Sequence, residues 1–286
     1  MRSVRLVHSV AAQGFDARSA ALYAKARPGY SRDALEHAVN AAGFGRSEKL
    51  HCVEVGAGTG KFTECLLDYK QEVWPTVDLK LTAVEPSDGF RNELSKCLAV
   101  KMLKHQGLSV EAGSGEALPI KTSQSVDAVM VAQAFHWMAN ESTLIEFHRV
   151  LKPGAPLILL WNALDMSVPW INSFEKDVLD KYYTPDIPRY LTFRWPSVFN
   201  SPSVKGVLFG EPVRWFGGYQ RFKATKQQFV ERVMSISVLA SKSHAEKKIV
   251  EDEVLELLAT HPDTKGVPDG EIEVTYKSEV CVVKRK

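Results

Sequence analysis

The chain has 286 residues, a formal net charge of +2, 45% hydrophobic residues and 24% charged residues. This length suits one large α/β domain with an insertion, or two small domains, and the composition is that of a globular protein. The balanced charge gives no field to attract nucleic acid or an acidic membrane, and no apolar run approaches the ~20 residues of a membrane span. We therefore expect neither partner, and the oligomeric state stays open.

The cysteines and the N-terminus bear on the cellular compartment. No CxxC pair and no metal-ligand spacing occurs among the four cysteines, which are Cys52, Cys65, Cys97 and Cys281. They are typical of free thiols in a reducing compartment, so we expect a cytoplasmic protein without a metal site. Residues 1–15 carry Arg2 and Arg5 and no acid, and whether they form a targeting signal stays open.

Hydrophobic patterning predicts a first helix and then strands that alternate with helices from residue 50 to residue 162. The predicted helices span residues 31–42, 59–69, 90–103 and 141–151. The predicted strands are the short apolar runs at residues 50–55, 81–84, 108–112, 126–132 and 156–161. Such alternation is typical of parallel β-α-β units, and right-handed crossovers make these units a doubly wound sheet.

After residue 162 the pattern changes. Residues 161–222 are rich in aromatic residues and prolines and have no clean periodicity, which predicts an inserted cap. Two capping-box patterns and one alternating run then predict helices over residues 229–238 and 245–258 and a strand over residues 271–283. We expect four parts: an N-terminal helical segment (1–45), an α/β core (46–162), a helical cap on the substrate side (163–270) and a terminal strand that completes the sheet (271–286).

The most informative motif is an apolar strand that leads into three alternating glycines, Gly56, Gly58 and Gly60. Glycine lets the backbone turn sharply and approach a ligand closely, and such a turn after a parallel strand forms a nucleotide-sized crevice. A dinucleotide fingerprint fails because Lys61 stands at its third glycine position. A P-loop fails because Val55 and Phe62 replace its first glycine and its hydroxyl residue. The pattern that remains is E-x-G-x-G-x-G.

This motif resembles the first motif of class I S-adenosylmethionine-dependent methyltransferases. Most of the chain is similar to the methyltransferase-11 type, and within it to the trans-aconitate methyltransferase branch. Six stretches carry the resemblance: residues 53–60, 84–86, 113–119, 133–137 and 148–154, with Arg27-Pro28-Gly29-Tyr30 near the N-terminus. The resemblance implies a Rossmann-like, mostly parallel seven-stranded sheet in the order 3-2-1-4-5-7-6, with an antiparallel seventh strand and a helical, aromatic-rich cap.

The resemblance also implies that S-adenosyl-L-methionine binds and that S-adenosyl-L-homocysteine is the product. A charged Glu54 in a buried strand would be costly without a partner, and it would accept a hydrogen bond from the donor's ammonium. Glu85 would accept hydrogen bonds from both ribose hydroxyls. Arg27 would pair with the donor's carboxylate, or else lie solvated on the surface. Glu116 and Phe135 are also candidate cofactor contacts. Glu116 could instead cap a short helix, and Phe135 could instead be a core residue. The other candidate cofactor contacts are Tyr23, Gly56, Ala57, Gly58, Gly60, Pro86, Gly115 and Gln133.

Residues 133–137 follow the fourth predicted strand, where reacting groups belong in this fold. His136 is the candidate catalytic base because its ordinary pKa, about 6.5, lets it accept a proton near neutrality; alternatively it hydrogen-bonds the cofactor or the loop. The candidate substrate pocket combines it with aromatic residues, namely Tyr30, Trp137, Trp161, Trp170 and Trp195. Arg189, Arg194 and Lys205 either anchor an acidic molecule there or are solvated cations on a packed cap.

The predicted activity is methyl transfer to an oxygen or nitrogen of a small molecule, with a carboxylic acid as one candidate acceptor. The alternatives are methylation of protein or RNA, and a non-catalytic binding protein on the same fold. The charge of +2 and the lack of a basic stripe disfavour RNA, and an aromatic pocket disfavours a large substrate. The glycine turn with both Glu54 and Glu85 disfavours a binding protein.

Overall fold

The computed structural model describes residues 17–267 and 271–286, so the candidate targeting segment lies outside the described residues. Seven strands form one sheet in the order β3-β2-β1-β4-β5-β7-β6. Their bounds are β1 Lys49–Val55, β2 Asp78–Glu85, β3 Leu108–Ala112, β4 Ala128–Ala132, β5 Pro156–Leu164, β6 Val213–Thr225 and β7 Glu271–Lys284. The first five strands pair in parallel, and β7 is antiparallel to both β5 and β6. The predicted fold class and strand order are confirmed.

Helices flank both faces of this sheet, with shorter turns between them. The α-helices are α2 Ala17–Ala26, α3 Arg32–Ala42, α4 Lys61–Val73, α5 Asp88–Cys97, α6 Ala99–Lys104, α7 Glu141–Val150, α8 Pro169–Ser173, α9 Lys226–Met234, α10 Ser237–Ala240 and α11 His244–Thr260. The shorter elements are η1 Phe135–Trp137, the π-helix η2 Phe174–Val178, η3 Leu179–Tyr182, η4 Tyr190–Thr192 and η5 Trp195–Asn200. None of the helices among residues 17–267 and 271–286 is long and apolar enough to cross a bilayer.

Alternation along the strands sorts the buried side chains into two layers. One layer packs against α3 and α4 and includes Cys52, Leu81, Met130, Ile158 and Leu160. The other packs against α7 and the 195–209 segment and includes Val53, Val55, Val129, Leu157 and Leu159. Because both faces are covered, the central strands are apolar runs rather than alternating ones.

Local capping signals act as the sequence predicts. Ser31 caps α3 by accepting from the backbone N–H of Ala34 at 3.2 Å, and Gly43 ends that helix with φ +102°. Both predicted capping boxes form, at Thr225 before α9 and at Ser243 before α11. The predicted helix over residues 90–103 is wrong in one respect, because it divides at Leu98 into α5 and α6.

The sheet extends into the segment that the sequence assigned to the cap. Residues 213–225 form β6, the edge strand beside β7, and most of its residues are exposed or half-buried. The register shifts between Gly217 and Gln220, so no apolar alternation marked this strand in the sequence. The terminal strand β7 lies between β5 and β6, as the resemblance implies.

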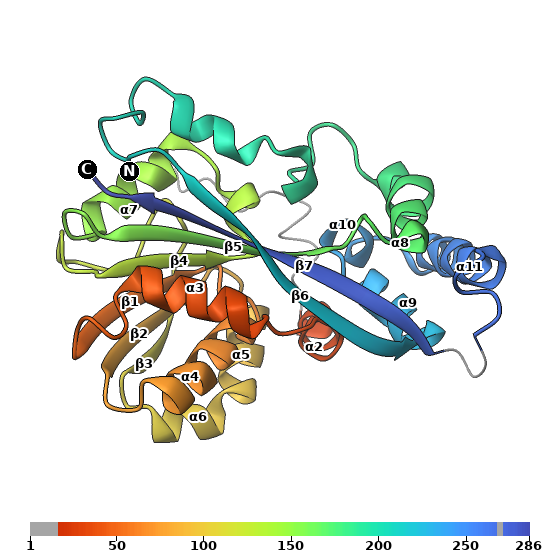
Figure 1. Cartoon of the computed structure of the whole chain (residues 1–286), viewed down its shortest axis with the longest axis horizontal. Coiled ribbons are helices and arrows are strands. Elements are labelled where there is room, and N and C mark those ends of the chain that lie inside the picture. The colour runs from red at the N-terminus through yellow and green to blue at the C-terminus, as the bar shows by residue number, and fades with distance from the viewer. Residues whose placement is uncertain (1–16, 268–270) are drawn as a thin grey trace.

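β6 and β7 run past the other strands towards α8, α9 and α11 (Figure 1). A third core forms there between the far ends of these two strands and the cap helices, and it includes Trp170, Phe174, Phe229, Leu239 and Tyr276. This core places the cap beside the carboxyl ends of the parallel strands, where the open sheets of α/β proteins bind ligands.

Candidate functional site

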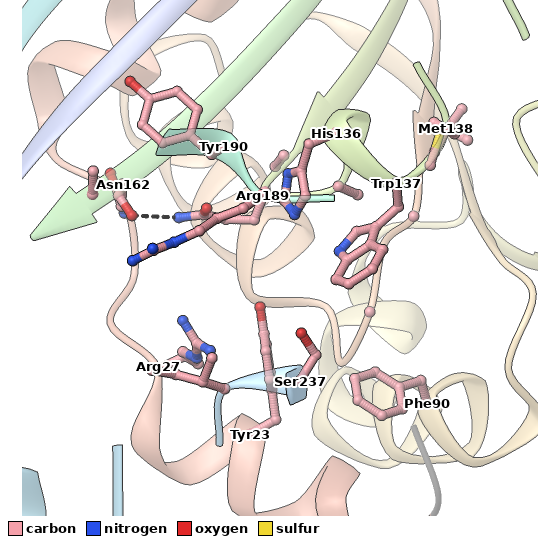
Figure 2. Close-up of a pocket in the computed structure, with 18 of the residues that line it drawn as sticks. Tyr23, Arg27, Phe90, His136, Trp137, Met138, Asn162, Arg189, Tyr190 and Ser237 are labelled. Carbon is pink, nitrogen blue, oxygen red and sulfur yellow. Dashed lines mark hydrogen bonds between the residues drawn. The ribbon is translucent and has the colours of Figure 1, made fainter. Parts of the chain in front are cut away.

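A cavity of about 480 Å³ lies at the carboxyl ends of β1, β2, β4 and β5. We call one part of it the glycine-turn half, which is lined by Gly56, Gly58, Glu85, Pro86, Phe90, Gly115, Glu116 and Met138. We call the other part the cap half, which is lined by Glu175, Leu179, Tyr183, Arg189, Tyr190, Leu191, Arg232, Ile236 and Ser237. Figure 2 shows Arg27, Arg189 and Asn162 on one side of this cavity, and Phe90, Trp137 and Met138 on the other.

The three predicted glycines form the turn between β1 and α4. All three have positive φ, at +71° for Gly56, +61° for Gly58 and +86° for Gly60. A Cβ on Gly56 would lie 2.7 Å from the Cβ of Ala134, so only glycine fits there without movement. Gly56 and Gly58 line the cavity, whereas Gly60 faces Leu94 and Leu98. Gly60 and the buried Ala57 therefore shape the turn without lining the cavity.

Glu85 ends β2 with its carboxylate in the wall of the cavity. Its two oxygens accept from the backbone N–H groups of Gly58, at 2.9 Å, and Ser87, at 3.0 Å. Burial raises the pKa of this carboxyl, and these two hydrogen bonds oppose the shift. Each oxygen still has a lone pair for a ligand. The acid and the glycine turn, predicted separately, are joined here by a direct hydrogen bond.

Glu54 does not line the cavity. Strand alternation places it on the α4 face of the sheet with Cys52, and its Oε2 accepts from the hydroxyl of Thr63 at 2.6 Å. Burial raises the pKa of this carboxyl to about 8. In this structure the partner of the buried acid is a threonine of the next helix, and the contact of Glu54 with a ligand stays a prediction.

The loops after β3 and β4 meet in the glycine-turn half. Glu116 lines the cavity and accepts from Nδ2 of Asn140 at 2.9 Å. Gly115 also lines it, and a Cβ there would lie 2.8 Å from the sulfur of Met138. Gln133 lines the cavity with φ +60°, held by a bond from its Nε2 to the carbonyl of Asn162 at 2.8 Å. Unusual backbone of this kind is concentrated at functional sites.

His136 and Trp137 both line the cavity, as predicted. Burial lowers the pKa of His136 to about 3, and its Nδ1 is buried without a hydrogen-bond partner in the described part of the chain. The imidazole is therefore neutral near pH 7 and too weak a base for the predicted role, because an efficient general base has a pKa near the working pH. It remains a hydrogen-bonding group in the wall.

Most of the aromatic residues assigned to the pocket belong to the cores instead. Trp161 and Trp195 pack with their rings tilted, 4.4 Å apart between centroids, within the second layer, and Phe135 packs edge-on against Trp195. Trp170 packs against Phe229 in the third core, and Tyr30 against Phe62 beside the first. Composition predicts aromatic content but not whether a ring faces a neighbour or a cavity. The core alternative holds for Phe135, and the four pocket candidates do not line this cavity.

The N-terminal helix α2 folds over the cavity and brings two predicted residues into its wall. Tyr23 contacts Phe90 at 5.7 Å between ring centroids. Arg27 donates from Nε to Oγ of Ser235 at 2.9 Å and from Nη2 to the Ser235 carbonyl. Burial and the nearby Arg232 lower the pKa of Arg27 to about 10. The segment lies over the cavity, and its place over a cofactor stays a prediction; its bond to the turn after α9 had no sequence signal.

The three cations proposed for the cap separate into different environments. Arg189 lines the cavity and forms ion pairs with Glu175 and Asp180. Arg194 and Lys205 are exposed and do not line it, so the solvated alternative is correct for both. Residues missed by the sequence include Glu175, Tyr183 and Arg232, because polar residues within helical turns have no spacing that separates cavity from surface.

The described residues hold no cluster of three or more side chains suited to a metal ion. Residues 53–159 match the family model described as a methyltransferase domain. The chain is 36% identical over 147 residues to an uncharacterised methyltransferase-like protein of Schizosaccharomyces pombe, and this match covers 51% of each chain. The chain thus spans about half the length of this relative. An uncharacterised methyltransferase of Mycobacterium bovis is 28% identical over 248 residues, covering 84% of each chain.

Solved structures support the fold. A candidate type II methyltransferase from Anaeromyxobacter dehalogenans has a TM-score of 0.56 at 16% identity, covering 90% of this chain and 97% of that one. The YcgJ protein from Bacillus subtilis has a TM-score of 0.52 at 14% identity, covering 89% and 98%. Together with the sheet order, these findings show that the chain has the Rossmann-like fold of these structures and that residues 53–159 are similar to the methyltransferase domain family.

Proposed function

We propose that this protein transfers a methyl group from S-adenosyl-L-methionine to a small-molecule acceptor held in the cap half of the cavity. The observation that supports this most is the bond between the Gly58 N–H and the Glu85 carboxylate in the cavity wall. It joins the two elements that a nucleoside donor needs, a close-approach backbone turn and an acid at the end of β2. The acceptor atom, oxygen or nitrogen, and the trans-aconitate branch are finer predictions within this proposal.

The residues present fit this donor. A side chain at Gly56 would collide with Ala134, so the turn leaves backbone open to the cavity. Glu85 would hold the ribose hydroxyls, and Pro86 with Gly115 and Glu116 would border the adenine. Arg27 would pair with the donor's carboxylate. When bound, the donor supplies an activated sulfonium methyl, which is the difficult part of the chemistry.

The protein's contribution is to bind, orient and exclude water. The helix α2 and the turn after α9 meet through Arg27 and Ser235, so they cover the cavity together. Holding donor and acceptor in line at contact distance replaces an encounter in solution. His136, with a pKa of about 3, would offer a neutral hydrogen bond rather than remove a proton. A carboxylic acid acceptor, ionised at pH 7, needs no base at all.

Calorimetry with S-adenosylmethionine and S-adenosylhomocysteine tests the proposal. We expect both to bind the wild-type chain, and Glu85→Gln to bind each about 10–100-fold more weakly, as for loss of a hydrogen bond to a charged group. Glu72→Gln, at an exposed acid that pairs with Arg32, is the matched control and should bind as the wild type does.

Activity is then measured as transfer of tritiated methyl to carboxylic acids, amines and thiols. Transfer to a small molecule supports the proposal. Donor binding with transfer only to protein or RNA would move the chain to a macromolecular substrate. No donor binding would favour a non-catalytic binding protein, and both results would overturn the proposal.

A further inference from the structure

The cap half of the cavity contains a charge cluster that the sequence did not reveal. Three arginines from three separate segments line the cavity in or beside this half: Arg27 directly after α2, Arg189 before η4, and Arg232 of α9. One buried carboxylate, Glu175, lies among them. Charges removed from water are costly unless they are paired, so the partner of each arginine indicates what the cluster can bind.

Arg189 already has its partners. Its guanidinium forms ion pairs with Glu175 and Asp180 and lies over the ring of Tyr183, 4.3 Å from the centroid. Glu175 lies in the π-helix η2, a rare helical form that is frequent at functional sites. With two carboxylates bound to it, Arg189 has little capacity for an acidic ligand.

Arg27 and Arg232 differ from Arg189 because their hydrogen bonds go to neutral groups. Arg27 donates to the hydroxyl and the carbonyl of Ser235, and Arg232 donates from Nε to the hydroxyl of Tyr276 at 2.7 Å. Neither forms an ion pair with any residue in the described ranges. The Nη1 atom of Arg232 is buried and, within the same ranges, has no hydrogen-bond partner. A buried, charged donor without an acceptor is costly, and an acidic ligand would remove that cost.

The two arginines come from segments that reach different parts of the cavity wall. Arg27 directly follows α2, whose Tyr23 contacts Phe90 in the glycine-turn half. Arg232 is on α9 and precedes the cap-half residues Ile236 and Ser237. The methyl donor has one carboxylate, and the proposed function pairs that carboxylate with Arg27. That leaves one guanidinium for the acceptor.

Resting on that proposed function, we infer that Arg232 binds a single carboxylate of the methyl acceptor, and that the rest of the acceptor is apolar. The apolar part has suitable walls in Leu179, Tyr183, Tyr190, Leu191 and Ile236. A second acidic group would find Arg189 occupied and the Glu175 carboxylate beside it, so diacids are disfavoured by like-charge repulsion and an unpaired charge.

The test is calorimetry on the full chain saturated with S-adenosylhomocysteine, with three probes of similar shape. The probes are 3-phenylpropionate, its neutral amide 3-phenylpropanamide, and the diacid phenylsuccinate. The variants are Arg232→Gln, the conservative Arg232→Lys, and Arg221→Gln as the control at an exposed arginine of β6.

We expect the wild type and Arg221→Gln to bind the monoacid at least 10-fold tighter than the amide and the diacid. Arg232→Gln should lose about 10-fold or more of the monoacid affinity and keep its affinity for S-adenosylhomocysteine within about 2-fold. Arg232→Lys keeps the charge, so it should keep a preference for the acid over the amide even if Arg232→Gln fails to fold.

Equal binding of acid and amide, or no binding of either, overturns the inference, as does tighter binding of the diacid. A loss of S-adenosylhomocysteine affinity equal to the loss of acid affinity in Arg232→Gln would assign this arginine to the donor instead. Failure of the wild-type chain to bind S-adenosylhomocysteine is a different result, because it overturns the proposed function itself.

Discussion

The two halves of the cavity are built in different ways. The glycine-turn half is made largely of backbone and of residues that directly follow strands, such as Gly56 after β1 and Glu85 at the end of β2. The cap half is made of side chains from η2, η3, η4, α9 and α10 and from the turns between them, which tertiary packing brings together. A motif therefore locates the first half, whereas only the folded chain reveals the second. The two halves should also respond differently to substitution.

Gly56→Ala should have the largest effect, because it damages the half that depends on backbone. The added Cβ meets Ala134 at 2.7 Å and φ is +71°, so we expect a stability loss of about 1–3 kcal/mol and no measurable donor binding. Gly154→Ala is the control, with φ +75° and no atom within 4 Å of the added Cβ. It should lose stability but keep donor binding, as measured by urea unfolding and calorimetry. Equal donor binding in both variants would contradict a backbone-built site.

Glu54→Gln tests whether this acid acts through the fold rather than through the cavity. The pKa of Glu54 is raised from 4.5 to about 8, so the folded state holds a proton that the unfolded state releases. The resulting stabilisation is complete below pH 4.5 and is lost as the pH rises towards 8, at about 1.4 kcal/mol per pH unit. Urea unfolding from pH 5 to 8 should show this downward slope in the wild type relative to the variant. Parallel stability curves would disprove the buried, protonated state.

His136→Gln separates a hydrogen-bonding wall residue from a base. A general base contributes about 100–10,000-fold to a rate, whereas we expect the variant to retain kcat within about 10-fold. Because the pKa of His136 is about 3, its titration should not shape the profile of kcat against pH near pH 6.5. The wild type and the variant should therefore have profiles of the same shape in that range. If an inflection in that range is present in the wild type and absent in the variant, His136 acts as a base after all.

Ser243→Ala should have the smallest effect, and it tests whether the stability of the cap affects donor binding. It removes the hydroxyl that caps α11, at a cost of about 1 kcal/mol of stability. The helix α11 does not line the cavity, so donor affinity should not change. Thermal unfolding and calorimetry measure the two quantities. A fall in donor affinity would mean that the stability of the cap controls the glycine-turn half.

The sequence predicts those features that depend on local chemistry. Continuous apolar runs gave the five parallel strands, and serine or threonine caps gave the starts of α3, α9 and α11. The edge strand β6 was missed because its residues are mostly exposed and its register is interrupted. The partner of Glu54 was not predicted, because the pattern shows that a buried acid needs a partner but not that Thr63 provides it. Arg232 and Glu175 had no signal, since contacts between distant segments create their environment.

The position of β7 has a consequence for the order in which the molecule assembles. Residues 165–267, with the whole cap, leave the ribosome before the strand that pairs β6 with the rest of the sheet. Until residues 271–284 are made, β5 has an unpaired edge and β6 has no neighbour. A nascent chain stalled in this interval would present two open β-edges, which favour self-association. Premature stop codons in the last strand should therefore produce insoluble protein rather than a soluble protein of lower stability.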